Sequence, residues 1–209
     1  MKKLLLVSLC CCSILSLKAQ NPVFNRSLSA AVEATDVSND ENRRFAGVKY
    51  SIIYSRPVFI GGRWSLESGL GYIDYYSYQQ FSPYRYFFKG NSSQRISADF
   101  AVLYNLLQAR RLAFRVGAGP SIWYQRNGNV RDLSGIFNGS QVERVTFNRV
   151  HSNDFNVGIN LRSDLEYKVA PRIILGARAG IIGSLTRQNA QGSLLGTLTT
   201  LGLSAGYRF

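Results

Sequence analysis

Residues 195–209 read Leu-Gly-Thr-Leu-Thr-Thr-Leu-Gly-Leu-Ser-Ala-Gly-Tyr-Arg-Phe and end the chain. Every second residue, counted back from the last, belongs to a mostly apolar set: Phe209, Tyr207, Ala205, Leu203, Leu201, Thr199, Thr197 and Leu195. The residues between them are small or polar, and Arg208 is one of them. Side chains alternate between the two faces of a strand, so one face suits lipid and the other a polar lumen. This stretch therefore predicts a membrane β-strand.

The same alternation recurs along the chain, over roughly the 9 to 11 residues that a tilted membrane strand needs. Eight segments show it: residues 27–34, 45–55, 63–75, 95–107, 112–124, 155–167, 172–185 and 195–209. The segment 155–167 is the clearest, because an apolar residue at almost every odd position alternates with glycine, asparagine and charged residues. An amphipathic helix would not carry this pattern.

The connections between these segments alternate in length. Those near residues 57–62, 108–111 and 168–171 are short, whereas 76–94 and 125–154 are long and polar. Short periplasmic turns and long extracellular loops are typical of outer-membrane barrels. Aromatic residues fall near the strand ends, where an interfacial girdle requires them: Tyr54, Trp64, Tyr104, Tyr124, Tyr167 and Tyr207. The sequence predicts an all-β protein, an eight-stranded antiparallel up-and-down transmembrane β-barrel in the bacterial outer membrane with a periplasmic N-terminus.

A soluble eight-stranded barrel of the lipocalin type is the main structural alternative. Its polarity is the opposite one, with apolar residues inside. Here the residues that the alternation places inside the barrel include five acids and five bases. They would form a neutral plug in a narrow lumen: Glu33, Lys49, Glu67, Asp99, Arg115, Arg162, Asp164, Glu166, Arg178 and Arg208.

The N-terminus has the features of an export signal. Lys2 and Lys3 precede an apolar stretch, residues 4–17, which is too short to span a membrane as a helix, and Leu17-Lys18-Ala19 resembles a cleavage site. We expect a signal peptide over residues 1–19 and a barrel domain over 20–209.

Cys10, Cys11 and Cys12 all lie in this leader, so the mature chain would have neither a disulfide framework nor a cysteine metal site. Lipidation at one of them is the weaker alternative, because none follows the small residue that such a signal needs.

The formal net charge of +13 would suggest nucleic acid in a soluble protein. The arginines are dispersed rather than clustered in a stripe, and an exported chain does not meet chromosomal DNA. Outer-membrane lipid and lipopolysaccharide phosphates are the expected partners. Arg126, Arg131, Arg144 and Arg149 in the second long connection could bind such phosphates, although a charged, solvated loop is the default interpretation of that connection.

No catalytic, cofactor or metal site is predicted. His151 lies close to Ser152 and Asp154, residue types that outer-membrane lipid A hydrolases and acyltransferases use, but residues so near in sequence make poor triad partners. The inward carboxylates suit neutralisation of the inward arginines better than acid–base catalysis.

The connection 76–94 interleaves aromatic and basic residues, including Tyr84, Arg85, Tyr86 and Phe87. Two interpretations stay open. The aromatics extend the membrane girdle beyond the bilayer, or they form a recognition surface, since exposed aromatics with arginine are typical of binding hot spots.

Three stretches carry a family resemblance: Lys18-Ala19-Gln20, residues 158–167 (Gly-Ile-Asn-Leu-Arg-Ser-Asp-Leu-Glu-Tyr), and Gly206-Tyr207-Arg208-Phe209. They resemble the outer-membrane β-barrel family of Bacteroidetes, including its PorT-like members. The resemblance implies an eight-stranded barrel, an assembly signal at Tyr207 and Phe209 that the barrel-assembly machinery reads, and, for PorT-like members, a role in protein secretion.

These observations predict a non-enzymatic integral outer-membrane protein with a structural, binding or secretion-accessory role and a protein partner in the envelope. An outer-membrane lipid A-modifying enzyme and a narrow channel are the alternatives.

Overall fold

The computed structural model describes residues 26–38, 44–58, 63–81, 84, 86–186 and 197–209. Within them the chain forms eight β-strands: β1 (Ser27–Ser38), β2 (Arg44–Pro57), β3 (Trp64–Phe81), β4 (Tyr86–Gln108), β5 (Leu112–Asn138), β6 (Gln141–Lys168), β7 (Ile173–Ser184) and β8 (Thr197–Arg208). The predicted leader, residues 1–19, lies outside the described residues. No helix long and apolar enough to cross a membrane occurs in the described part of the chain.

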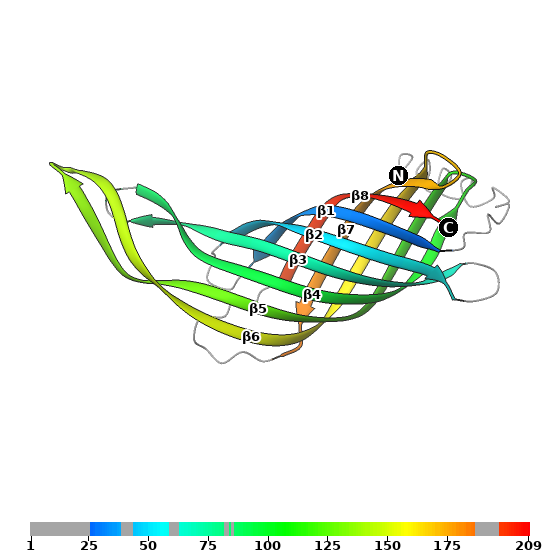
Figure 1. Ribbon diagram of the computed structural model, residues 1–209, viewed down its shortest axis with the longest axis horizontal. Helices are drawn as coiled ribbons and strands as arrows, with labels where there is room; N and C mark the ends of the chain where they lie inside the picture. The colour runs from blue at the N-terminus through cyan, green and yellow to red at the C-terminus, as the bar shows by residue number, and fades with distance from the viewer. Residues whose placement is uncertain (1–25, 39–43, 59–62, 82–83, 85, 187–196) are drawn as a thin grey trace, which may run out of the picture.

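The strands form one closed antiparallel barrel in sequence order. Closure depends on β1, whose predicted segment 27–34 shows the weakest alternation of the eight. In the structure β1 runs on to Ser38 and pairs along its whole length with β8, from Ser27 opposite Arg208 to Ser38 opposite Thr197. The up-and-down eight-stranded barrel that the sequence predicts is thus confirmed (Figure 1).

The polarity of the barrel wall is the membrane-protein one. Leu70, Leu201 and Leu203 expose 67–71% of their surface on the outside, whereas Glu67 and Asp164 expose 1–2% inside. Burying charges while exposing leucines would be unfavourable for a barrel in water. The outward and inward faces predicted from the alternation are therefore correct, and the lipocalin-type polarity is excluded.

The prediction of two long polar loops at residues 76–94 and 125–154 is wrong. Most of these residues are strand: β3 continues to Phe81, β4 begins at Tyr86, and β5 and β6 are paired as far as Asn138 opposite Gln141. The turn between them is only Gly139 and Ser140, and Gly139 has φ +63°, a conformation that a side chain disfavours. These residues lack the alternation of apolar and polar side chains that marks a membrane strand, because their buried face carries polar side chains such as Ser77, Gln125 and Asn127.

The result is a short barrel with two long hairpins. In Figure 1 the hairpins β3–β4 and β5–β6 extend past the ends of β1, β2, β7 and β8, on the side opposite to the start of β1 and the end of β8. We call this side the hairpin end and the other the termini end. Strands β2, β4 and β6 end at the termini end and β3, β5 and β7 begin there, the side on which the short connections are predicted.

Candidate functional site

The lumen near the termini end is filled by a continuous chain of ion pairs. Glu67 on β3 binds both Arg162 on β6 and Arg178 on β7, the latter at 2.7 Å. From Arg178 the chain continues through Asp164 to Arg115 on β5.

Arg115 is the branch point between this chain and the termini end. It pairs with Glu166 and donates a hydrogen bond to Ser55 Oγ at 3.3 Å. Glu166 in turn binds Arg208 on β8 at 2.8 Å. Arg115, Asp164 and Arg178 lie directly opposite one another on the neighbouring strands β5, β6 and β7. The pairs that Glu67 forms with Arg162 and Arg178, and Glu166 with Arg208, join strands that are not neighbours in the barrel.

Glu33, Lys49 and Asp99 are the predicted inward charges for which the described residues show no ion pair to this chain. Glu33 accepts a hydrogen bond from Thr200 on β8 at 3.3 Å, and Asp99 is the acid that pairs with Lys49. It lies closer to the hairpin end, where it binds Lys49 Nζ at 2.6 Å and accepts a hydrogen bond from Ser121 Oγ at 2.5 Å. Gly71 makes room for this pair, because a Cβ added there would lie 2.9 Å from the Lys49 side chain.

The space left among the charged side chains is minimal. The cavity lined by Glu67, Arg115, Asp164, Glu166 and Arg178 measures about 10 Å³, which holds no more than one water molecule. This part of the lumen is a polar plug, not a passage.

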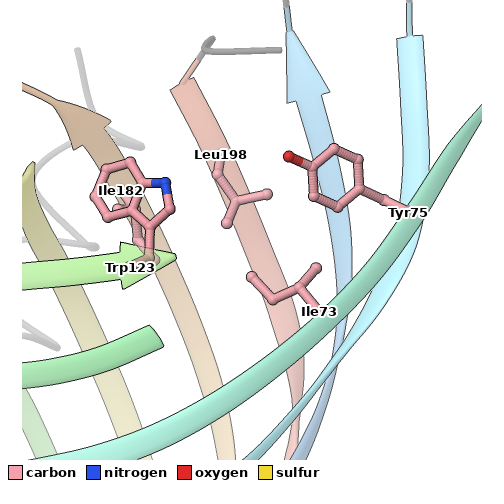
Figure 2. Close-up of a cluster of buried hydrophobic side chains, with 5 residues drawn as sticks. All are labelled: Ile73, Tyr75, Trp123, Ile182 and Leu198. Atoms are coloured by element: carbon pink, nitrogen blue, oxygen red, sulfur yellow. The ribbon is translucent and has the colours of Figure 1, made fainter. Parts of the chain in front are cut away.

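A buried arginine that the sequence analysis missed lies nearer to the hairpin end. Arg95 on β4 is 4% exposed and its guanidinium stacks on the Trp123 ring, 3.7 Å from the ring centroid. No carboxylate lies within ion-pair distance among the described residues, and its Nε and Nη2 atoms have no hydrogen-bond partner there. Beside it the only hydrophobic cluster of the described lumen is formed by Ile73, Tyr75, Trp123, Ile182 and Leu198, whose side chains point toward one another (Figure 2).

The two projecting hairpins are joined to each other beyond the barrel. Arg149 on β6 donates hydrogen bonds to the backbone oxygens of Lys89 and Gly90 on β4, at 3.4 and 3.3 Å. Phe147 of β6 packs on Phe88 of β4, with ring centroids 5.5 Å apart. The hairpins therefore form one body rather than two independent loops.

The tips of the hairpins also meet. Tyr84, in the β3–β4 connection, contacts Phe137 at the end of β5 with ring centroids 4.8 Å apart. β5 reaches this position through a bulge after Arg131, where Asp132 adopts φ +53° and accepts a hydrogen bond from Asn148. Asp is among the few residues that tolerate this backbone region.

The predicted recognition residues lie on this body. Phe87 is 66% exposed and Tyr84 is 46% exposed, while Tyr86 is partly covered; Arg85 lies outside the described residues. Tyr78, which is 67% exposed, adds to the same surface and makes an edge-on contact with Tyr76. The candidate binding surface is thus presented at the hairpin end, mostly by strand residues.

The arrangement around His151 offers no hydrolase triad. His151 is on strand β6, not in a loop. Because successive side chains of a strand face opposite sides, His151 lies on the opposite face from Ser152 and Asp154. Asp154 accepts a hydrogen bond from Asn127 instead. No group of three or more potential metal ligands occurs in the described part of the chain.

The predicted assembly residues lie at the end of the chain, Tyr207 within β8 and Phe209 directly after it. Tyr207 is 45% exposed and its hydroxyl accepts a hydrogen bond from Arg172, and Phe209 is 56% exposed. The backbone of Phe209 pairs with that of Arg26, which extends the β1–β8 seam by one residue.

No protein-family model and no curated protein sequence matches the chain. Solved structures do match its fold. Neisserial surface protein A is 16% identical with a TM-score of 0.53, over 88% of this chain and 97% of that one. A major outer membrane protein of Thermus thermophilus is 12% identical with a TM-score of 0.54, over 88% and 99%. OprG of Pseudomonas aeruginosa is 7% identical with a TM-score of 0.50, over 88% and 96%. The chain therefore has the fold of the small outer-membrane β-barrel proteins.

Proposed function

We propose that this protein is an integral outer-membrane barrel that acts by binding, with the joined hairpins as its extracellular recognition surface. The observation that carries the proposal is the pairing of β3–β4 with β5–β6 beyond the barrel, held by Arg149 and by aromatic contacts. A preformed surface loses little conformational entropy on binding. Exposed Tyr78, Tyr84 and Phe87 give it the aromatic anchors that protein interfaces favour.

The proposal includes export by a signal peptide over residues 1–19, assembly through Tyr207 and Phe209 by the barrel-assembly machinery, and contact of exposed arginines with lipopolysaccharide phosphates. A protein partner in the envelope, as in the secretion role of PorT-like proteins, is the preferred ligand of the hairpins. Lipid A modification finds no support in the placement of His151, and a channel finds none in the filled lumen.

The test is site-specific photo-crosslinking in living cells. A photoreactive amino acid replaces Phe87 at the hairpin end in one strain and Leu203, 71% exposed on the barrel wall, in another. We expect a discrete crosslinked complex from the Phe87 position and none from the Leu203 position, because only the first belongs to the proposed surface. Recovery of the uncrosslinked monomer from both strains would contradict the proposal.

A matched variant separates surface from barrel. Replacing Tyr78 and Tyr84 by Ser removes aromatic anchors without touching the lumen, so the complex should be lost while the protein keeps its folded, heat-modifiable form. Persistence of the complex in this variant would show that the aromatic residues are not the contact.

A further inference from the structure

The termini end of the barrel is ringed by positive charge. The three connections there, residues 56–63, 108–111 and 168–172, contain no Asp or Glu. Together with the residue before β1 they contribute seven cations: Arg26, Arg56, Arg63, Arg110, Arg111, Lys168 and Arg172. The six arginines are all exposed. In contrast, the exposed arginines of β5 and β6 near the hairpin end are interspersed with Asp132 and Glu143.

Two of these arginines are fixed on the outer wall rather than over the lumen. Arg63 donates a hydrogen bond to the Tyr104 hydroxyl at 3.1 Å, and Arg172 donates one to the Tyr207 hydroxyl at 2.9 Å. Tyr104 packs on Trp64, with ring centroids 4.8 Å apart. Aromatic residues in this position mark the boundary between hydrocarbon and headgroups in membrane barrels. These guanidinium groups therefore lie at the depth of lipid phosphates.

The cations are distributed around the circumference. They belong to the end of β2, the residue before β3, the β4–β5 connection, both ends of the β6–β7 connection, and the residue preceding β1. A single protein partner would contact one side of such a ring. A shell of lipid headgroups contacts all of it, and a guanidinium offers a phosphate several N–H donors at once.

We propose that this ring, the cationic rim, binds the phosphate groups of anionic phospholipids in the leaflet that faces the termini. The inference rests on the membrane placement proposed above but not on the hairpins having a partner. Arg63 and Arg172 hold headgroups at the wall, and Arg56, Arg110 and Arg111 extend the positive field beyond it. Binding would fix the depth and tilt of the barrel, so that the hairpins stand at a defined height on the opposite side.

The experiment measures lipid selectivity of the full mature chain refolded into vesicles of phosphatidylcholine with a minor fraction of phosphatidylglycerol. Native mass spectrometry of the extracted protein counts the two lipids that stay bound. A basic residue near an anionic surface contributes roughly a fivefold gain in local affinity. We therefore expect phosphatidylglycerol to be enriched, and the triple variant R56Q/R110Q/R111Q to lower that enrichment by at least about tenfold.

The matched control is R56K/R110K/R111K, which keeps the positive charge at the same three positions. It should keep the enrichment. An unchanged enrichment in the rim variant, or an equal loss in both variants, would overturn the proposal. If the triple variant does not refold, R63Q/R172Q, which leaves Arg56, Arg110 and Arg111 in place, gives the same readout.

The failure of this proposal can be told apart from failure of membrane placement. Conversion to the heat-modifiable form in pure phosphatidylcholine vesicles reports insertion alone, and the crosslink at Phe87 reports the hairpin surface alone. Only the bound-lipid ratio reports the rim.

Discussion

Glu67 is the residue on which the lumen network depends most, because one carboxylate neutralises both Arg162 and Arg178. Replacing Glu67 by Gln keeps the volume but leaves two buried guanidinium groups short of charge. Loss of one partner in a buried ion pair costs about 3–5 kcal/mol. We expect the free energy of unfolding, measured by urea titration of the vesicle-embedded protein, to fall by that order.

The exposed Glu143 provides the control for this substitution. Glu143→Gln should change the free energy of unfolding by less than about 0.5 kcal/mol, as surface substitutions usually do. Equal stability of the two variants would mean that the network of Glu67 contributes nothing that water does not replace.

A comparison of Arg95 with Arg178 measures how much a carboxylate partner stabilises a buried arginine, since both side chains are 4% exposed. Arg178 binds two carboxylates, whereas Arg95 has the Trp123 ring and no carboxylate among the described residues. A desolvated cation–π contact is worth about 2 kcal/mol, less than the cost of an uncompensated buried charge. We expect Arg95→Met to leave the urea midpoint unchanged or raise it, and Arg178→Met to lower it. The reverse order would mean that Arg95 has a stabilising role that its contacts do not reveal.

The alternation in the sequence assigns residues to faces but not to partners. It places Glu67, Asp99 and Arg178 inside, yet nothing in it separates Asp99 from the other acids, because pairing across the lumen depends on strand tilt and register. Arg95 was missed for a related reason. It stands at the first position of a predicted strand, where a basic residue reads as a headgroup contact, while the real strand begins nine residues earlier at Tyr86.

At the scale of the element, Arg149 is predicted to hold the two hairpins together. Its hydrogen bonds go to backbone oxygens at the edge of β4, so Arg149→Gln removes them without altering the strands themselves. Labels at Phe87→Cys and Ile136→Cys, both exposed and one on each hairpin, report their separation by pulsed electron paramagnetic resonance. All native cysteines lie in the predicted leader, so these labels should be unique in the mature chain.

We expect a narrow distance distribution in the Arg149 protein and a broader one after Arg149→Gln. Arg126→Gln serves as the comparison, because Arg126 is exposed on β5 and belongs to neither contact. A distribution that is narrow in all three proteins would assign the joining of the hairpins to the aromatic contacts alone.

The sequence predicts the part of a long strand that lies in the barrel wall, but it does not predict the part that projects beyond the wall. Within the wall, lipid on one side and lumen on the other impose an alternation, and the eight spanning segments follow from it. Beyond the wall this alternation is lost, because the buried face of the hairpins carries polar side chains such as Ser77 and Asn127. At the hairpin surface the predicted local structure is therefore wrong, and the binding role of the predicted residues stays a prediction.

For the whole molecule, the filled lumen predicts that the barrel does not conduct ions. A hydrated ion needs a continuous aqueous path, and the cavity among Glu67, Arg115 and Asp164 is about 10 Å³, the volume of one water probe at most. Opening a path would require breaking several buried ion pairs together, at a cost of several kcal/mol each. In a planar bilayer the wild-type protein should show no stepwise current.

The double variant E67A/R115A, which removes two side chains that cross the lumen, should show current steps if it still folds. Tyr84→Ala at the hairpin end should show no current. Regular current steps from the wild type would mean that the ion-pair chain rearranges readily, and the binding role proposed for the hairpins would then have to be weighed against transport.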